Sequence, residues 1–227
     1  SLAPGGYFWF FDNVTKDIIS FNPATHKILH RVNINTAIPG AFGQTLFEDS
    51  NNRIWFSSWN NKMAVVDYKT NNITAIAYKN ENPLSVAGDS FWDVLEDEDN
   101  NIWLATAGGL SKCNYSKNVY TIVPIVDKVP EFKNSKLGAF SIDPRDRSWW
   151  IASDEGKVSV IHYYPETGRY NYFDFSKTIK NKAGQLPGPV YSVNFLDGKP
   201  YACTHTGVWK LDEKTNEIEI VKQKVAQ

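Results

Sequence analysis

The sequence predicts an all-β fold, a β-propeller of about five four-stranded blades, on the strength of two marks that repeat in phase. The first mark is an aromatic residue after a turn-forming stretch, and successive copies lie 46, 48, 47 and 51 residues apart. These copies are Trp9, Trp55, Trp103, Trp150 and Tyr201. The second mark is a turn segment ending in threonine, at 22–25, 67–70, 164–167 and 212–215. A shared period of this length indicates an array of similar units.

The third unit shows how one repeat becomes a sheet. Residues 92–96 and 102–106 are short apolar stretches on either side of a turn-forming cluster at 97–101. A glycine-containing connection then leads to further predicted strands at 110–115 and 120–125. A lone meander of this kind exposes its edges, and face-to-face stacking of several meanders buries their Trp and Phe rows. A β-sandwich would lack the fixed period, and a parallel β-helix would repeat at about half this length.

The predicted domain is single and spans 1–227, with blades at approximately 7–34, 42–79, 90–125, 138–175 and 189–221. The first blade begins in its second strand, and 222–227 is too short to supply the missing first strand. The chain is therefore expected either to form an imperfectly closed ring or to be a fragment of a larger or paired propeller array.

The repeat register also predicts the core. The expected buried side chains are Trp9, Leu46, Trp55, Val94, Trp103, Ile142, Trp150, Val193 and Tyr201. No convincing helix is predicted, because the two candidate segments, 134–139 and 177–182, are both short and polar.

The composition excludes some classes of partner. The chain has 24 basic and 25 acidic residues and a net charge of −1, with no long basic run. Nucleic acid and anionic membrane surfaces are therefore not expected partners. No apolar stretch approaches the ~18 residues of a membrane span, so no membrane insertion of this domain is expected.

No catalytic residue, metal or cofactor is predicted. The four histidines have no metal-ligand spacing, and no phosphate loop or nucleophile elbow is present. The acidic run at 96–99 is interpreted as a solvated turn, with a calcium site as the weaker alternative. Cys113 and Cys203 are expected to be small buried thiols, with a disulfide or metal pair as the alternative.

The segment 80–114 resembles the two-component-regulator propeller repeat. It has the loop residues Pro83 and Ser85, a strand ending in Glu96-Asp97, the pair Ile102-Trp103, and a Gly-Gly-Leu sequence at 108–110. Other units resemble the repeat less closely, because the second has 61–63 and the fourth has 154–156 in place of Gly-Gly-Leu.

This resemblance implies the periplasmic sensor region of a hybrid two-component system of Bacteroidetes-type bacteria, in a parent protein anchored in the inner membrane. It implies no enzyme activity in this domain, and a ligand that is an oligosaccharide derived from a glycan. The expected partners are that oligosaccharide, other propeller or receptor domains of the same parent, and a second copy of the chain. The alternative is a small propeller enzyme, resembling lactonases or lyases, with its site at the mouth of the central channel.

The binding face is predicted from loop length. The short turns within blades suit a scaffold, whereas the connections at 35–42, 79–90, 127–138 and 176–189 are long and irregular. Aromatic side chains there would stack on sugar rings, and short polar groups would bond hydroxyls. The candidate ligand-binding residues are Trp59, Asn60, Asp89, Trp92, Asp154 and His205.

Overall fold

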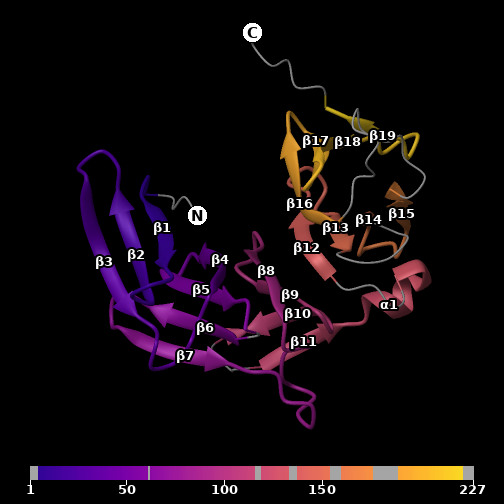
Figure 1. Cartoon of the computed structure of the whole chain (residues 1–227). Coiled ribbons are helices and arrows are strands. Elements are labelled where there is room, and N and C mark those ends of the chain that lie inside the picture. The colour runs from indigo at the N-terminus through magenta and orange to yellow at the C-terminus, as the bar shows by residue number, and fades with distance from the viewer. Residues whose placement is uncertain are drawn as a thin grey trace. The chain divides into compact units, whose positions relative to one another are not determined.

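The computed structural model describes residues 5–60, 62–115, 119–132, 137–153, 160–175 and 189–221. Two compact units, Ser1–Val123 and Pro124–Gln227, divide the chain between the third and fourth sheets. Each unit consists of antiparallel sheets whose strands follow one another in sequence order, as the colour gradient of Figure 1 shows. The predicted all-β propeller fold is confirmed, with five blade-like sheets.

The first unit contains three sheets. The first sheet comprises β1 (Phe8–Asp12), β2 (Asp17–Asn22) and β3 (Lys27–Asn33). The second comprises β4 (Gly43–Glu48), β5 (Arg53–Ser58), β6 (Lys62–Asp67) and β7 (Asn72–Ile76). The third comprises β8 (Phe91–Glu96), β9 (Ile102–Thr106), β10 (Gly109–Asn114) and β11 (Val119–Val123).

The second unit begins with a helical connection and contains two sheets. The connection consists of α1 (Ile125–Lys128) and the short 3-10 helix η2 (Pro130–Phe132). The fourth sheet comprises β12 (Leu137–Ile142), β13 (Trp149–Ser153), β14 (Val160–Tyr163) and β15 (Tyr170–Phe173). The fifth comprises β16 (Val190–Leu196), β17 (Lys199–Thr204), β18 (Gly207–Leu211) and β19 (Ile218–Ile220). Among the described residues, no helix is long and apolar enough to cross a membrane.

The helix prediction was wrong at one place. Residues 125–128 form a helical turn, although a strand was expected to extend to residue 125. In the helix candidate 134–139, residues 137–139 belong to the strand β12. The other candidate, 177–182, lies outside the described residues. The turn forms because Ile125, Val129 and Phe132 are all buried, and their spacing places them on one side of a helix.

Three of the repeated tryptophans, Trp9, Trp55 and Trp150, pack in cores between neighbouring sheets, as predicted. In β5, Trp55 belongs to the core shared with the third sheet, whereas its neighbours Ile54 and Phe56 belong to the core shared with the first. This alternation is the two-residue period of a strand buried on both faces. Six of the nine predicted core residues are buried, and Leu46, Ile142 and Tyr201 are half-buried.

Among the described residues, the first sheet has three strands, and none of them occupies the first-strand position of the repeat. Trp9 lies in β1, as Trp55 lies in the second strand of its own sheet, so β1 occupies the second-strand position. Phe8 and Phe10 of β1 are 44% and 42% exposed. In the described residues, the first blade therefore begins with a strand that occupies the second position of the repeat.

An aspartate six residues before the tryptophan stabilises the second and third blades. Trp55 Nε1 donates a 2.8 Å hydrogen bond to Asp49 Oδ2, and Trp103 Nε1 donates one of the same length to Asp97 Oδ2. Burial acts to raise the pKa of Asp97, but the bonds from Trp103 and Asn101 outweigh it and hold that pKa below its ordinary value. The acidic run at 96–99 therefore includes a structural carboxylate.

In the second and third blades, the glutamate beside this aspartate bonds to the preceding blade. Glu48 accepts hydrogen bonds from Tyr7 and from Trp9 Nε1 in the first blade, at 2.9 Å each. Glu96 likewise accepts bonds from the backbone N and Oγ of Ser50 in the second blade, at 2.7 and 2.6 Å. The Glu-Asp pair of the repeat thus serves packing between blades as well as turn formation.

A buried histidine lies in the fourth sheet. His162 is fully buried in β14, its ring stacks on Trp150 at 4.1 Å between centroids, and its Nε2 lies 2.6 Å from Ser148 Oγ. Burial lowers the pKa of His162 below its ordinary value of 6.5, against the opposing effect of the nearby Glu213 carboxylate.

Acidification is therefore expected to destabilise the protein through His162. The pKa of His162 is lower in the folded state than in the unfolded state. Its contribution to the free energy of unfolding is therefore fully present above pH 6.5, and it is lost as the pH falls from there toward the folded-state pKa. The free energy of unfolding should fall by up to about 1.4 kcal/mol per pH unit in this window. Urea denaturation at a series of pH values should show the dependence in wild type and in His205→Gln, and a flatter profile in His162→Gln. An unchanged profile in His162→Gln would assign the dependence to other groups.

Candidate functional site

In the first unit, the long connections meet the sheets at one end. Gly43 pairs with Ser58 where β4 begins and β5 ends, and Phe91 pairs with Thr106 in the same way in the third sheet. Because the strands are antiparallel, the connection into a first strand and the loop after a second strand lie at the same end. This loop end carries the predicted residues Trp59, Asn60, Asp89 and Trp92.

Trp59 is exposed but held by its backbone. Its N–H donates a 2.9 Å hydrogen bond to the Phe42 carbonyl, and the Ser58 hydroxyl both accepts from Phe42 N–H and donates to the Phe42 carbonyl. Asn60 Nδ2 donates to the Gly40 carbonyl at 3.1 Å. Trp59 is 58% exposed and Phe42 is 55% exposed. The loop thus presents two large aromatic groups to solvent on an ordered backbone.

Trp92, from the neighbouring blade, meets Trp59 edge to face. Their ring centroids lie 6.1 Å apart with planes at 84°. Trp92 is half-buried, and its Nε1 is enclosed without a hydrogen-bond partner among the described residues. The Trp92 carbonyl accepts a 3.1 Å bond from Thr45 Oγ1, which ties β8 to β4. The pair therefore spans two blades.

A small cavity of about 250 Å³ adjoins β4 at this end. It is lined by Phe11, Asn13, Gly43, Gln44, Thr45, Leu46 and Phe56. Asn13 Oδ1 accepts a 3.1 Å hydrogen bond from Gly43 N, so the side chain is held at the rim. Thr45 lines this cavity and also bonds the Trp92 carbonyl, so it is the residue that the cavity and the aromatic pair share.

Asn13, Gln44 and Phe42 were missed by the sequence predictions. A signal for Asn13 exists, because it follows Trp9 by the same four positions as Trp59 follows Trp55. Asp154 and His205 occupy this position in the fourth and fifth units. Gln44 and Phe42 lie at the entry to β4, where no repeated pattern marks them.

Three further residues were predicted for the site, namely Asp89, Asp154 and His205. Asp89 is exposed just before β8, where its Oδ1 accepts a 3.4 Å bond from Ser90 Oγ. His205 is exposed in the turn between β17 and β18 of the second unit, and Asp154 lies outside the described residues. Of the predicted site residues that the structure describes, Trp59 and Trp92 are brought into side-chain contact.

The loop at 79–90 is rigidly packed against the third sheet. Ala107 N donates to the Ser90 carbonyl, and Ala87 N donates to Ser111 Oγ, both at 2.9 Å. A Cβ atom added to Gly108 would lie 1.9 Å from the Ala87 carbonyl oxygen, so only glycine fits there. The loop that delivers Asp89 and Trp92 is therefore part of the scaffold.

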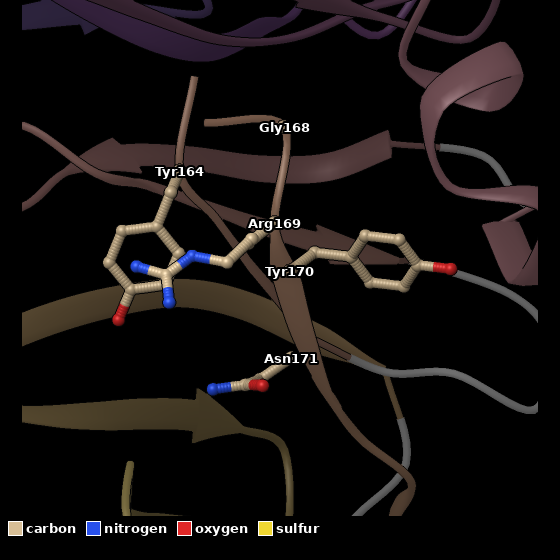
Figure 2. Close-up of a pocket in the computed structure, with 5 residues that line it drawn as sticks. All are labelled: Tyr164, Gly168, Arg169, Tyr170 and Asn171. Atoms are coloured by element: carbon tan, nitrogen blue, oxygen red, sulfur yellow. The ribbon is translucent and has the colours of Figure 1, made fainter. Parts of the chain in front are cut away.

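A shallower cavity of about 370 Å³ lies in the second unit, against the edge strand β15. Figure 2 shows the Arg169 guanidinium beside the Tyr164 ring, with Tyr170 pointing away from them and Asn171 below. The Arg169 Cζ lies 5.6 Å from the centroid of Tyr164. Few side chains converge on this space, so it is a weaker candidate than the loop end of the first unit.

The chemistry of the described residues offers little for catalysis. Ser148, His162 and Glu213 resemble a nucleophile, base and acid, with His162 Nδ1 3.9 Å from Glu213 Oε2. However, Ser148 and His162 are 1% and 0% exposed, so a substrate could not reach them. In the part of the chain that the structure describes, no group of three or more His, Cys, Asp or Glu side chains could hold a metal ion.

Comparisons with known proteins agree with this fold. The family described as "Two component regulator propeller" matches residues 85–108, and no curated protein sequence matches the chain. The extracellular domain of a protein described as a hybrid two component system of B. thetaiotaomicron superposes with a TM-score of 0.66 at 15% identity, covering 96% of this chain and 26% of that one. A streptogramin B lyase superposes with a TM-score of 0.66 at 18% identity, covering 98% and 67%.

A second extracellular domain from B. thetaiotaomicron, also described as part of a hybrid two component system, gives a TM-score of 0.61 at 12% identity, covering 100% of this chain and 34% of that one. This chain therefore spans about a quarter to a third of the length of these sensor structures. At such identities the likeness establishes the propeller fold and leaves ligand and activity to be proposed.

Proposed function

Residues 85–108 are a two-component-regulator propeller repeat, and from this premise we propose that the chain is a ligand-sensing or interaction domain of a signal-transduction receptor. The extracellular placement of the similar hybrid-system domains supports a periplasmic location, in a parent protein anchored in the inner membrane. Any kinase activity would belong to another part of that parent. Its partners would be other propeller or receptor domains of the same protein, or a second copy of this chain.

We propose a glycan-derived oligosaccharide as the ligand, bound at the loop end of the first unit. The observation that carries this proposal is the exposed Trp59, held edge to face against Trp92 on an ordered loop. The C–H face of a sugar ring packs on an indole face, and the nearby polar side chains of Asn13 and Gln44 would bond hydroxyl groups.

Removal of the Trp59 side chain should weaken ligand binding without unfolding the protein. A thermal-shift screen against assorted oligosaccharides would identify a ligand, and calorimetry would then measure its Kd. Trp59→Ala should weaken Kd by at least about tenfold, which corresponds to about 1.4 kcal/mol of lost contact. The melting point without ligand should change little, because Trp59 is 58% exposed.

Tyr172→Ala is the matched control, because it removes a 40% exposed aromatic group from the second unit and should leave Kd unchanged. Unaltered affinity in Trp59→Ala would place the binding site elsewhere. If no oligosaccharide in the screen shifts the melting point, the proposal of an oligosaccharide ligand would be wrong. The proposal of an interaction domain in a receptor would be unaffected.

A small propeller enzyme is the second candidate, favoured by the superposition on a streptogramin B lyase, of which this chain covers 67%. A catalytically inactive virginiamycin B lyase from Staphylococcus aureus also superposes, with a TM-score of 0.66 at 15% identity. Metal analysis of the purified protein separates the candidates: stoichiometric, tightly bound calcium or zinc would favour the enzyme. The sensor proposal expects no such metal.

A further inference from the structure

The cavity beside β4 has a lining that suits a neutral group with one apolar part. It lies between the first and second blades, and its volume is about 250 Å³. This volume is below the usual range of whole small-molecule sites, so the cavity suits one substituent of a sugar better than a complete ring. None of its lining residues carries a charged side chain: Phe11, Asn13, Gly43, Gln44, Thr45, Leu46 and Phe56.

The apolar part of this lining is a packed cluster. The Phe11 and Phe56 rings lie 4.6 Å apart between centroids, and Leu46 lies directly across the strand pair from Phe56. Phe11 and Leu46 are only partly buried, so the cluster keeps accessible apolar surface. Gly43 leaves this space unfilled, and a Cβ atom there would lie 2.7 Å from Phe11 Cδ1. A methyl group of a ligand would be removed from water on this surface.

A β-bulge places Gln44 at the cavity. Gly43 pairs with Ser58 and Thr45 pairs with Ser57, so Gln44 is the extra residue of β4 and stands outside the ladder. Bulges of this kind re-aim a side chain and recur beside functional sites. Gln44 is half-buried, and its side-chain amide makes no hydrogen bond with a described residue. This amide therefore has both a donor and an acceptor to offer a ligand.

Asn13 supplies a second amide, in a fixed orientation. Its Oδ1 accepts a 3.1 Å hydrogen bond from Gly43 N, so the side-chain nitrogen is the atom left to bond a ligand. The turn that carries Asn13 is ordered, because Val14 N donates to Asp12 Oδ1 and Lys16 N donates to the Asp12 carbonyl, both at 2.8 Å. A donor at Asn13 and an acceptor at Gln44 match the C=O and N–H groups of a secondary amide.

An N-acetyl group meets both parts of this lining. Its methyl group is apolar, its carbonyl accepts a hydrogen bond and its N–H donates one. A hydroxyl group would bond the amides but would leave the apolar cluster in contact with water. A carboxylate or a free amine would bring a charge to a lining that holds no counter-charge.

We infer that this cavity binds the N-acetyl group of an N-acetylhexosamine. The methyl group packs on Phe11 and Phe56, the carbonyl accepts from Asn13 Nδ2, and the N–H donates to Gln44 Oε1. The inference rests on the proposed function, because it requires a saccharide at the loop end of the first unit and names its class. Trp59 contacts the third blade, on the other face of the second blade, so ring stacking and acetyl recognition are separate contacts.

NMR titration with sugars that differ at one substituent tests the inference. N-acetylglucosamine and N-acetylgalactosamine are compared with glucose and galactose, which carry a hydroxyl group in place of the acetamido group, and with glucosamine and galactosamine, which carry a free amine. Diacetylchitobiose is compared with cellobiose in the same way. At least one acetylated sugar should have a Kd about tenfold or more below those of its counterparts, the usual gain from one well-placed small group.

Gln44→Ala should raise the Kd of that acetylated sugar about fivefold, because its N–H loses an acceptor, and should leave the Kd of the hydroxyl counterpart unchanged. Asn51→Ala is the matched control, since it removes an exposed amide from the turn at the opposite end of the second blade and should change neither value. Trp59→Ala should weaken both kinds of sugar by the same factor. Melting points check that each variant is folded.

Equal Kd values for the acetylated sugars and their counterparts would overturn the N-acetyl assignment and leave the proposed function standing, since sugars would still bind. An unchanged preference in folded Gln44→Ala would also overturn the assignment, because the acetyl group would then bind elsewhere. If none of the sugars binds at millimolar concentration, the saccharide ligand is rejected and this inference with it.

Discussion

Asp49→Ala is expected to lower the free energy of unfolding by about 3–5 kcal/mol, the range for breaking a buried ion pair from one side. The substitution leaves the Arg53 guanidinium without its counter-charge and leaves Trp55 Nε1 without its acceptor. The backbone N–H groups of Asn51 and Arg53, which donate hydrogen bonds to Asp49 Oδ1, would also lose their acceptor in the β4–β5 turn. Water cannot easily replace these bonds, because Asp49 is fully buried.

Urea denaturation at pH 7 measures this effect, and Asp97→Ala is the matched control. Asp97 occupies the same repeat position and accepts from Trp103 Nε1, but its neighbour is Asn101 in place of an arginine. It should therefore lose hydrogen bonds without exposing an unpaired buried cation, at a cost of about 1–3 kcal/mol. Equal losses in the two variants would show that the Asp49–Arg53 ion pair adds nothing beyond the hydrogen bonds.

Trp55→Ala is expected to cost about 3–5 kcal/mol, the usual range for removing a buried tryptophan. Trp55 is fully buried in the core between the second and third blades, beside Met63, Val65 and Val94. Its removal would leave a cavity that the surrounding strands cannot close, because each is fixed by its own ladder of hydrogen bonds. The same denaturation measurement reports the loss.

Trp59→Ala provides the comparison, since it removes the same side chain four residues away. That indole is 58% exposed and touches Trp92 at its edge, so the expected loss is about 1 kcal/mol or less. A similar loss in both variants would mean that Trp59 is part of the core and would weaken its assignment to the ligand site.

The sequence by itself determined the blade and its repeat. The aromatic residue, the aspartate six positions before it and the turn between them are local, so their spacing is visible along the chain. The apolar pattern within a strand is also local, and it predicted that the repeated tryptophans are buried. Trp9, Trp55, Trp103 and Trp150 are all buried, as predicted. The position of Trp9 in the period also predicted that β1 is a second strand of the repeat, and Trp9 lies in β1 as Trp55 lies in β5.

Only the tertiary structure decided which side chains meet. Trp59 and Trp92 come from different blades, as do Arg53 and Tyr115, and no pattern along the chain relates the members of either pair. Their proximity depends on how neighbouring sheets pack, which the repeat period does not encode. From the sequence, the end of the blades that carries the short turns was predicted to serve only as a scaffold. In the structure, packing of the second blade against the third leaves a cavity at that end, where Arg53 contacts Asp49 and Tyr115.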